Sequence, residues 1–246
     1  MSVMTKLTLD DLKNNKKVRV YLEKADAHLA GIGYTEHGLR HANIIGTRSQ
    51  NILLRLNYKD GDARLAAIAG FLHDIGNVVG RINHGQAGAI LAQPILTEIG
   101  MDIEDIVLVM SAIANHEEEA GDPTNIISAS LIIADKSDVH RSRVRNPSLI
   151  SAALILDNKM DPLSAPCGSA IGFYDIHDRV NYAATESELK VDSAGKSIVL
   201  ELTIDTKISD VMEYFEIFLS RMIICRKAAK FLGCDFHLVI NNVRLS

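Results

Sequence analysis

Apolar residues recur at spacings of three and four positions from about Leu9 to Ser137, with Gly, Asn or Asp at the breaks between the runs. This period matches one face of an α-helix and predicts a series of amphipathic helices. The predicted helices span residues 8–33, 36–56, 61–78, 84–100, 102–118 and 125–140. Thr8 is a suitable N-cap and Gly31 a suitable end for the first helix, and Pro94 is predicted to kink the fourth.

The pattern changes in the last third of the chain. Residues 184–205 alternate polar and apolar positions about a turn at residues 193–195, which predicts a β-hairpin. Residues 208–232 return to helical spacing and end at Gly233, and residues 236–245 have the composition of a strand. The helix carries an apolar stripe that we expect to cover the small sheet, formed by Val211, Tyr214, Phe215, Phe218, Met222, Cys225 and Ala229.

These elements predict a mainly α protein in which a helical bundle precedes a small α+β subdomain with ββαβ order. The predicted helical domain covers residues 1–175 and the C-terminal subdomain residues 176–246. Between them, residues 141–170 hold three of the five prolines around one short helical segment near Leu149 to Asn158. A length of 246 residues with 47% hydrophobic content suits one good-sized domain with an appendage.

The charge balance limits the classes of partner. A net charge of −5 and a pI near 6.0 argue against a dedicated nucleic-acid or membrane-surface binder, because such proteins need a segregated basic patch. No apolar run reaches membrane-spanning length, and the first residues are too polar for the core of a signal peptide. We therefore expect a cytoplasmic protein.

The three cysteines are expected to be packing residues. Their number is odd, and Cys167, Cys225 and Cys234 have none of the close pairings typical of metal sites. Reduced thiols are thus favoured over a disulfide framework.

The histidines and carboxylates are unevenly placed. Five of the nine histidines lie between His37 and His116, on or near the ends of predicted helices. The doublet His73-Asp74 follows the apolar run "AAIAGFL", and Asp135 ends the run "SASLIIA". A single histidine at a helix end is usually structural. A set of histidines and carboxylates at the ends of buried runs needs a common partner to offset desolvation, and a metal ion is the simplest one.

The order of these residues carries a family resemblance. Residues 35–140 resemble the HD-domain metal-dependent phosphohydrolases: "HGLRHANIIG" resembles the family's first helix, "FLHDIGN" its defining doublet and "ADKSDVHR" its closing aspartate helix. The resemblance implies an all-helical HD-domain bundle. It also implies that one metal ion is coordinated by His41, His73, Asp74 and Asp135.

Two further histidines indicate a second ion. His84 in "NHGQAG" and His116 in "ANHEEEAGDP" match the additional histidines of the dinuclear branch, in which the aspartate of the doublet, here Asp74, bridges both metals. Such a ligand set favours manganese, iron, nickel, cobalt or zinc. Two divalent transition metal ions can deprotonate a bridging water, so hydroxide would be the nucleophile, with Asp74 as a catalytic residue. No motif for a serine or cysteine nucleophile is present.

His37 stands four residues before His41, so the two imidazoles share one helix face. Related cyclic-nucleotide phosphodiesterases have a histidine at this spacing that donates a proton to the leaving group, so the resemblance suggests His37 as general acid. Metal ligation and a hydrogen bond to a ligand are the alternatives. Lys136 and Arg141 are candidates for phosphate recognition, with Lys136 also catalytic. For the other basic residues of this segment, His140, Arg143 and Arg145, the alternative is a solvated face that pairs with Glu117, Glu118 and Glu119.

The chain departs from the HD-GYP phosphodiesterases of cyclic di-GMP. Those enzymes have paired histidines and a glycine-tyrosine-proline loop, where this chain has His116 followed by "EEEAGDPTN". The ββαβ tail is not part of the minimal HD domain. It can complete the pocket, pair two subunits through an exposed strand edge, or bind a regulator, and of these we expect a homodimer.

The predicted function is hydrolysis of a phosphomonoester or phosphodiester of a small, nucleotide-like substrate. Two other functions share the ligand order. One is a non-catalytic HD-domain sensor that keeps the metal-filled pocket as a ligand site, and the other is an HD oxygenase with a di-iron centre. Because all six expected ligands are present, catalysis is favoured over the sensor.

Overall fold

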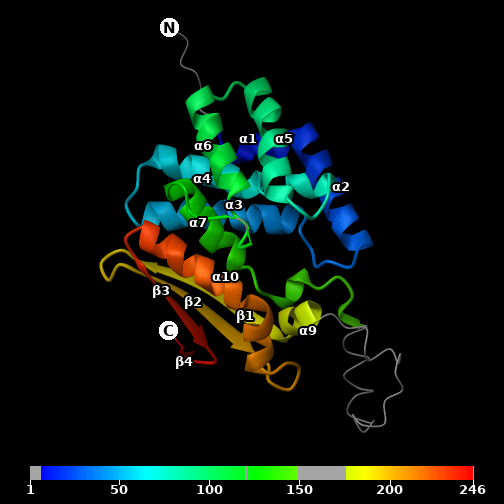
Figure 1. Ribbon diagram of the computed structural model, residues 1–246, viewed down its shortest axis with the longest axis vertical. Coiled ribbons are helices and arrows are strands. Elements are labelled where there is room, and N and C mark those ends of the chain that lie inside the picture. Colours follow the sequence, from blue (N-terminus) through cyan, green and yellow to red (C-terminus); the bar gives the residue numbers. More distant parts are fainter. Residues whose placement is uncertain (1–6, 120, 149–175, 246) are drawn as a thin grey trace.

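The computed structural model describes residues 7–119, 121–148 and 176–245. Helices make up the N-terminal part of the molecule, and a small sheet with one long helix lies against one end of them (Figure 1). A mainly α fold with a C-terminal α+β part is thereby confirmed. The segment predicted as helical near Leu149 to Asn158, and Cys167, lie outside the described residues.

The predicted helices are present, with changes at their ends. Thr8 forms a capping box with Asp11 at the start of α1, and α2 ends at Gly31, as predicted. The first predicted helix is two helices, however, because Asn15 adopts an extended conformation and caps the second one through its side chain. The elements are α1 (Leu9–Asn14), α2 (Lys16–Gly31), α3 (Leu39–Arg55), α4 (Asp60–Leu72), η1 (Ile75–Val78), α5 (His84–Glu98), α6 (Ile103–Ala114), α7 (Ile126–Lys136) and η2 (Arg141–Arg143).

Three helices end at least four residues earlier than the periodicity predicts, and each of these ends lies at a candidate ligand. Helix α4 stops at Leu72, so the doublet forms the bend before η1, with Asp74 at φ −95° and ψ 0°. Helix α6 stops at Ala114, before His116, and α7 stops at Lys136. A polar side chain at a helix end can turn away from the helix axis toward a neighbouring helix.

Glycines allow the helices that carry these ends to approach closely. A Cβ atom on Gly70 would lie 2.8 Å from the carbonyl oxygen of Ile45, across the contact between α3 and α4. A Cβ atom on Gly76 would lie 1.9 Å from the carbonyl oxygen of His84, so only glycine fits where η1 meets the start of α5. These approaches bring the starts of α3 and α5 next to the end of α4.

The C-terminal part is a four-stranded sheet in the order β1-β2-β3-β4, preceded by α9 (Ile176–Ala183). β1 (Ala184–Asp192) and β2 (Ser197–Ile204) form the predicted antiparallel hairpin. α10 (Val211–Phe231) then crosses to β3 (Asp235–Ile240), which pairs parallel with β2. The predicted final strand is interrupted: Asn241 and Asn242 both have positive φ, 49° and 65°, and form a tight turn to the short β4 (Val243–Arg244).

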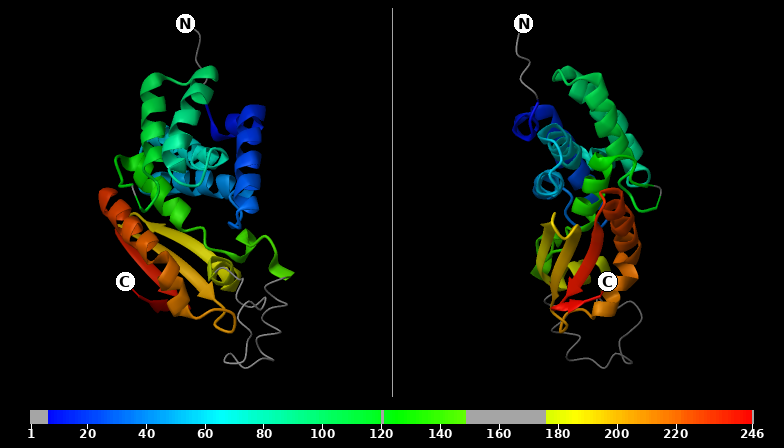
Figure 2. Two further views of the ribbon diagram at one scale, coloured as in Figure 1. Left: turned by 45° about the vertical axis from the view of Figure 1, so that its right-hand side comes forward. Right: turned by 90° about the vertical axis from the view of Figure 1, so that its left-hand side faces the viewer.

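Helix α10 lies along one face of the sheet and also packs against α7 (Figure 2). Most of its predicted apolar stripe is buried, including Tyr214, Phe218 and Met222, and the inward residues of the strands alternate with exposed ones. Cys225 and Cys234 are buried free thiols. Helix α10 thus covers one face of the sheet and joins it to α7 of the helical domain.

The sheet is also tied to the helical domain at the end of α7. The carbonyl oxygen of Ser137 accepts hydrogen bonds from Arg48 Nη1, at 2.9 Å, and from Ser187 Oγ on β1, at 2.9 Å. The boundary between residues 175 and 176 and the pairing of two subunits stay predictions. Within the described ranges, no helix combines the length and the apolar character needed to cross a bilayer.

Candidate metal centre

The fold brings together all six predicted metal ligands, although they are far apart in the sequence. We call them the histidine–aspartate cluster. They come from the start of α3, the end of α4, the start of α5, the end of α6 and the end of α7. They form three overlapping groups whose ligand atoms lie within 4.8 Å of one another: His41, His73 and Asp74; His73, His116 and Asp135; Asp74, His84 and His116.

Each imidazole of the cluster is fixed through its Nδ1 atom. His73 Nδ1 lies 2.8 Å from the carbonyl oxygen of Gly70, and His84 and His116 make equivalent contacts to Arg81 and Ile113, at 2.9 and 2.6 Å. A carbonyl oxygen only accepts, so each Nδ1 must carry the hydrogen. In the neutral ring, each Nε2 is therefore left with a lone pair, which is the state that binds a metal ion.

These Nε2 atoms face one another in pairs. His41 Nε2 lies 3.3 Å from His73 Nε2, and His84 Nε2 lies 3.1 Å from His116 Nε2. Two lone pairs at this separation repel each other unless a cation or a proton lies between them. Because the rings are buried, water cannot screen that repulsion.

Asp74 lies between the two histidine pairs. Its Oδ1 accepts a hydrogen bond of 2.8 Å from Asn77 Nδ2 and lies 3.4 Å from His84 Nε2. Its Oδ2 lies 3.3 Å from His73 Nε2 and has no hydrogen-bond partner among the described residues, although it is buried. A buried carboxylate oxygen without a partner costs free energy, which a metal ion would offset. The cluster thus fits a divalent metal ion beside Asp74.

The pKa of His73 reflects the same concentration of charge. Burial lowers this pKa, but the carboxylates of Asp74 and Asp135 outweigh burial and raise it to about 10. For Asp135, burial raises the pKa. The charges of Lys136 and of the cluster histidines outweigh burial and hold that pKa well below its ordinary value. A divalent ion can take the place of the proton on such a histidine.

Comparison with known families agrees with this geometry. Residues 34–141 match the family model named HD domain, and the matched range contains all six cluster residues. Residues 34–141 form an HD domain. The HD-domain family consists largely of metal-dependent hydrolases, and the histidine and aspartate groups of the cluster are placed for a metal site.

A relative of this chain is found in an archaeon. The chain is 30% identical over 165 residues to an uncharacterized protein of Methanocaldococcus jannaschii. The match covers 58% of this chain and 63% of the relative, so the chain spans less than two thirds of that protein's length. No solved structure gives a significant match.

Lys136 contacts carboxylates within the HD domain. Its Nζ lies 2.9 Å from Asp135 Oδ2, 3.0 Å from Glu117 Oε1 and 2.7 Å from Glu118 Oε2. Burial lowers the pKa of Lys136, but these three carboxylates outweigh it and hold the pKa above its ordinary value. Lys136 therefore neutralises the acidic side of the cluster here, and its contact with substrate stays a prediction.

Glu117 is a candidate ligand that the sequence did not single out. Its Oε1 lies 3.2 Å from His116 Nε2 and 3.5 Å from His84 Nε2. The carboxylate is thus in reach of an ion held by His84 and His116. The signal was present only as the first residue of an acidic run, which by itself is typical of a solvated loop.

His37 lies beside the cluster but does not join it. Its ring centroid is 5.3 Å from that of His41, and its Nδ1 donates to the carbonyl oxygen of Thr35 at 2.7 Å. Its Nε2 accepts a hydrogen bond of 2.7 Å from Arg143 Nη2. Burial and the charge of Arg143 lower the pKa of His37 well below its ordinary value. Proton donation by His37 would need Arg143 to move away, so its role as general acid stays a prediction.

Arg141 does not line the cavities beside the cluster in the described part of the chain. Its guanidinium lies over the ring of Tyr182, at 5.6 Å from the centroid, whereas Arg143, two residues later, is buried and faces the cluster. Nothing in the local sequence distinguishes the two arginines. The turn of η2 decides which one points inward.

Asp138 is a further residue that the sequence analysis did not single out. Its Oδ2 lies 2.7 Å from His41 Nδ1, and it also accepts a hydrogen bond of 3.1 Å from Arg40. It thus fixes His41 as the carbonyl oxygens fix the other three histidines. The signal was its position three residues after Asp135, just beyond the end of α7.

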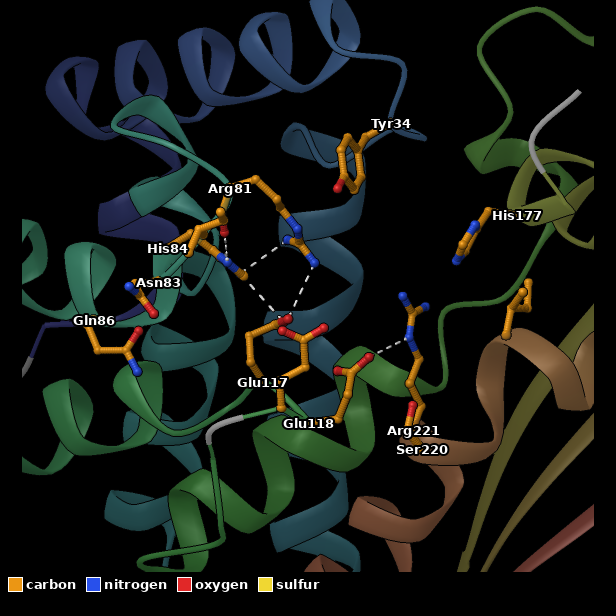
Figure 3. A pocket seen from close by; sticks show the side chains of 13 residues that line it. Tyr34, Arg81, Asn83, His84, Gln86, Glu117, Glu118, His177, Ser220 and Arg221 are labelled. Atoms are coloured by element: carbon orange, nitrogen blue, oxygen red, sulfur yellow. Dashed lines mark hydrogen bonds and ion pairs between the residues drawn. The ribbon is translucent and has the colours of Figure 1, made fainter. Parts of the chain in front are cut away.

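An open cavity of about 450 Å³ lies over the cluster, between the HD domain and α10 (Figure 3). Tyr34, Arg81 and His84 line it from one side, and His177 and Arg221 from the other. Arg81 Nη2 donates to Glu117 Oε2 at 3.3 Å, and Arg221 Nε donates to Glu118 Oε1 at 3.0 Å. The C-terminal subdomain therefore contributes side chains to the cavity, which is one of the three roles considered for it.

Proposed function

We propose that this protein is a metal-dependent phosphohydrolase that cleaves a phosphomonoester or phosphodiester of a small, nucleotide-like substrate. The observation that supports it most is the position of Asp74, whose two carboxylate oxygens face two separate pairs of imidazole nitrogens. His41, His73 and Asp135 would hold one ion with Asp74, and His84 and His116 would hold the second. Two such ions lower the pKa of a bound water and stabilise charge on phosphoryl oxygens.

The side chains around the cluster suit a phosphate ester. Arg81, Arg143 and Arg221 line the small space directly over Asp74 and Asp135, and guanidinium groups match the geometry of phosphoryl oxygens. Lys136 holds Asp135 and Glu117 in place. These residues would bind and orient the phosphoryl group while the cluster supplies the hydrolytic water.

The cavity outside this space suits the organic part of the substrate. Its volume of about 450 Å³ is in the range of small-molecule sites. The rings of Tyr34 and His177 line it together with polar groups, which supports a nucleotide-like leaving group.

A screen of phosphate esters tests the proposal. The purified protein is assayed with aryl phosphate monoesters and diesters in the presence of several divalent metals, and the bound metal is measured by elemental analysis. We expect hydrolysis that depends on added metal, and loss of both hydrolysis and bound metal in Asp74→Ala. Hydrolysis retained by a metal-free Asp74→Ala protein would contradict the proposal.

A further inference from the structure

A second, smaller cavity lies beside the cluster and is unlike its surroundings in charge. Its volume is about 120 Å³, several times the roughly 30 Å³ that one water molecule takes up in the liquid. The described residues that line it include no aspartate and no glutamate. They are Tyr34, Thr35, His37, Arg81, Arg143, His177, Asn181 and Arg221. We call it the basic cavity.

The basic cavity concentrates positive charge in a chain whose net charge is −5. The side chain of Arg143 is only 6% exposed, and four of its hydrogen bonds go to neutral groups, the carbonyl oxygens of Asp138 and Glu36 and the His37 ring. The nearest carboxylate oxygen to its Nε, Asp138 Oδ2 at 3.8 Å, already accepts from Arg40 and His41. Asp138 and Asp135 therefore offset the charge of Arg143 only in part, since its hydrogen bonds go to neutral groups.

Arg221 has donors available for a ligand. It uses Nε for Glu118 Oε1, and its guanidinium lies over the Phe218 ring, at 4.7 Å from the centroid. Among the described residues, its two terminal amino groups make no hydrogen bond. Stacking on Phe218 holds the guanidinium in one orientation, so less freedom is lost when it binds an anion.

The basic cavity adjoins the space over the metal cluster, because His37, Arg81, Arg143 and Arg221 line both. An anionic group bound there would be a neighbour of a phosphoryl group at the metals. Arg143, His177, Asn181 and Arg221 all lie outside the segment that matches the HD domain. The cavity is therefore a feature of how this chain joins its C-terminal subdomain to that domain.

We infer that the basic cavity is a subsite for a second phosphoryl group of the substrate, next to the phosphoryl group that is hydrolysed. This inference rests on the proposed function, because only that function makes the ligand a substrate. The residues that line the basic cavity include none of the six cluster residues. It narrows the substrate class to phosphate esters that carry two neighbouring phosphoryl groups, as in a nucleoside diphosphate.

Binding of inorganic phosphate to metal-depleted protein tests the subsite apart from catalysis. Calorimetric titration is expected to show one equivalent of phosphate bound to the wild-type protein. Arg221→Gln should weaken it by about 10-fold, the effect of losing hydrogen bonds from a charged donor, and Arg221→Lys by less. Arg226→Gln is the matched control, since Arg226 is exposed on the same helix and lines neither cavity.

Kinetics with metal present then test the substrate class. Because Arg221 lines both spaces, Arg221→Gln should raise KM for both kinds of substrate, but by about 10-fold more for a substrate with two neighbouring phosphoryl groups than for a simple aryl phosphate. Equal phosphate binding by the wild type, Arg221→Gln and Arg226→Gln, or none by the wild type, would overturn the inference. A protein that hydrolyses no ester but binds phosphate through Arg221 would overturn the proposed function and leave the anion site supported.

Discussion

Asp138 Oδ2 lies 2.7 Å from His41 Nδ1, and both groups are buried. The carboxylate fixes the ring so that the Nε2 lone pair of His41 points to the other ligands. Burial raises the pKa of Asp138, but the contacts with His41, Arg143 and Arg40 outweigh it and hold that pKa well below its ordinary value. A charged carboxylate behind a ligand ring also makes the ring a stronger donor to a metal.

Asp138→Asn is therefore expected to weaken metal binding without removing a ligand. Outer carboxylates of this kind typically contribute about 10- to 100-fold in metal affinity. Competition with a chromophoric chelator measures the affinity, and Asp122→Asn serves as the control because that carboxylate is exposed and bonded only to Lys227 among the described residues. Unchanged affinity in Asp138→Asn would show that His41 does not ligate through Nε2.

We expect the second proposed ion to be removable separately from the first. His84 belongs to only one of the three ligand groups, the group with Asp74 and His116. His84→Ala is expected to lower the metal content from two ions to one, as measured by elemental analysis after gel filtration. Gln86→Ala, a substitution in the same helix, should keep both ions. A protein that loses all metal in His84→Ala would have one shared site rather than two.

Glu117 is expected to strengthen the same ion. Its Oε1 is in reach of an ion at His84 and His116, so Glu117→Gln should lower the affinity of the second ion by about 10-fold and leave the first one unchanged. Stepwise calorimetric titration with Mn²⁺ distinguishes the two. The control is Glu119→Gln, at an exposed residue of the same acidic run. If the two variants show the same loss of affinity for the second ion, Glu117 acts only through the negative charge of the acidic run and not as a ligand.

Much of this site could be predicted from the sequence, because the signals for it lie in short stretches of the chain. The helices could be predicted from their periodic apolar residues. The cluster residues stand at the ends of apolar runs, where a buried polar side chain needs a partner, and His73-Asp74 is the clearest case. The periodicity did not reveal where helices end: Asn15 divides the first helix, and Asn241-Asn242 divides the last strand. Asn15 breaks the helix because its side chain caps the next one, and Asn241 and Asn242 break the strand because they adopt positive φ. The pattern of apolar residues contains neither signal.

The residues around the cluster were harder to predict because they depend on tertiary contacts. Arg221 reaches the cavity only because α10 packs on α7, and no pattern near residue 221 points to a phosphate. Arg143 and Arg141 are equivalent in sequence, and the turn at η2 separates their roles. Helix α9 was not predicted at all.

Metal binding should stabilise the fold. Neighbouring Nε2 atoms lie 3.1 and 3.3 Å apart and Asp74 Oδ2 has no hydrogen-bond partner among the described residues, so the folded protein should bind ions that the unfolded chain holds weakly. A free ion concentration of 100 times Kd should add about 2.7 kcal/mol. That corresponds to a rise in Tm of roughly 5–10 °C for a chain of this size, measured by calorimetry against chelator-treated protein. The Asp74→Ala protein should show no rise.

Acid should weaken the loop that carries His37. Asp26 accepts hydrogen bonds from Arg145 Nη2, at 2.6 Å, and from the His37 backbone, at 2.9 Å. Burial raises the pKa of Asp26, but these bonds outweigh it and lower the pKa below 3.8. The stabilisation is therefore present above about pH 4 and is lost as pH falls through the lowered value.

Asp26→Asn is expected to cost about 1 kcal/mol at pH 7, discounted for its partial exposure. The difference from the wild type should shrink below pH 4, as measured by urea unfolding at a series of pH values. Asp10→Asn, at an exposed residue of α1, should show a smaller difference. A difference between wild type and Asp26→Asn that stays constant down to the acid transition would contradict this account of the loop.

The central claim is that the histidine–aspartate cluster holds two divalent ions and that both are needed to hydrolyse a phosphate ester. Titration of chelator-treated protein with Mn²⁺, while hydrolysis of the best ester from the screen is followed, tests it most directly. The expected result is no turnover at the start and a rate that reaches its plateau at about two equivalents, as a two-metal mechanism requires. Full turnover before any ion is added, or a rate that stays at zero with every metal and ester, would contradict it.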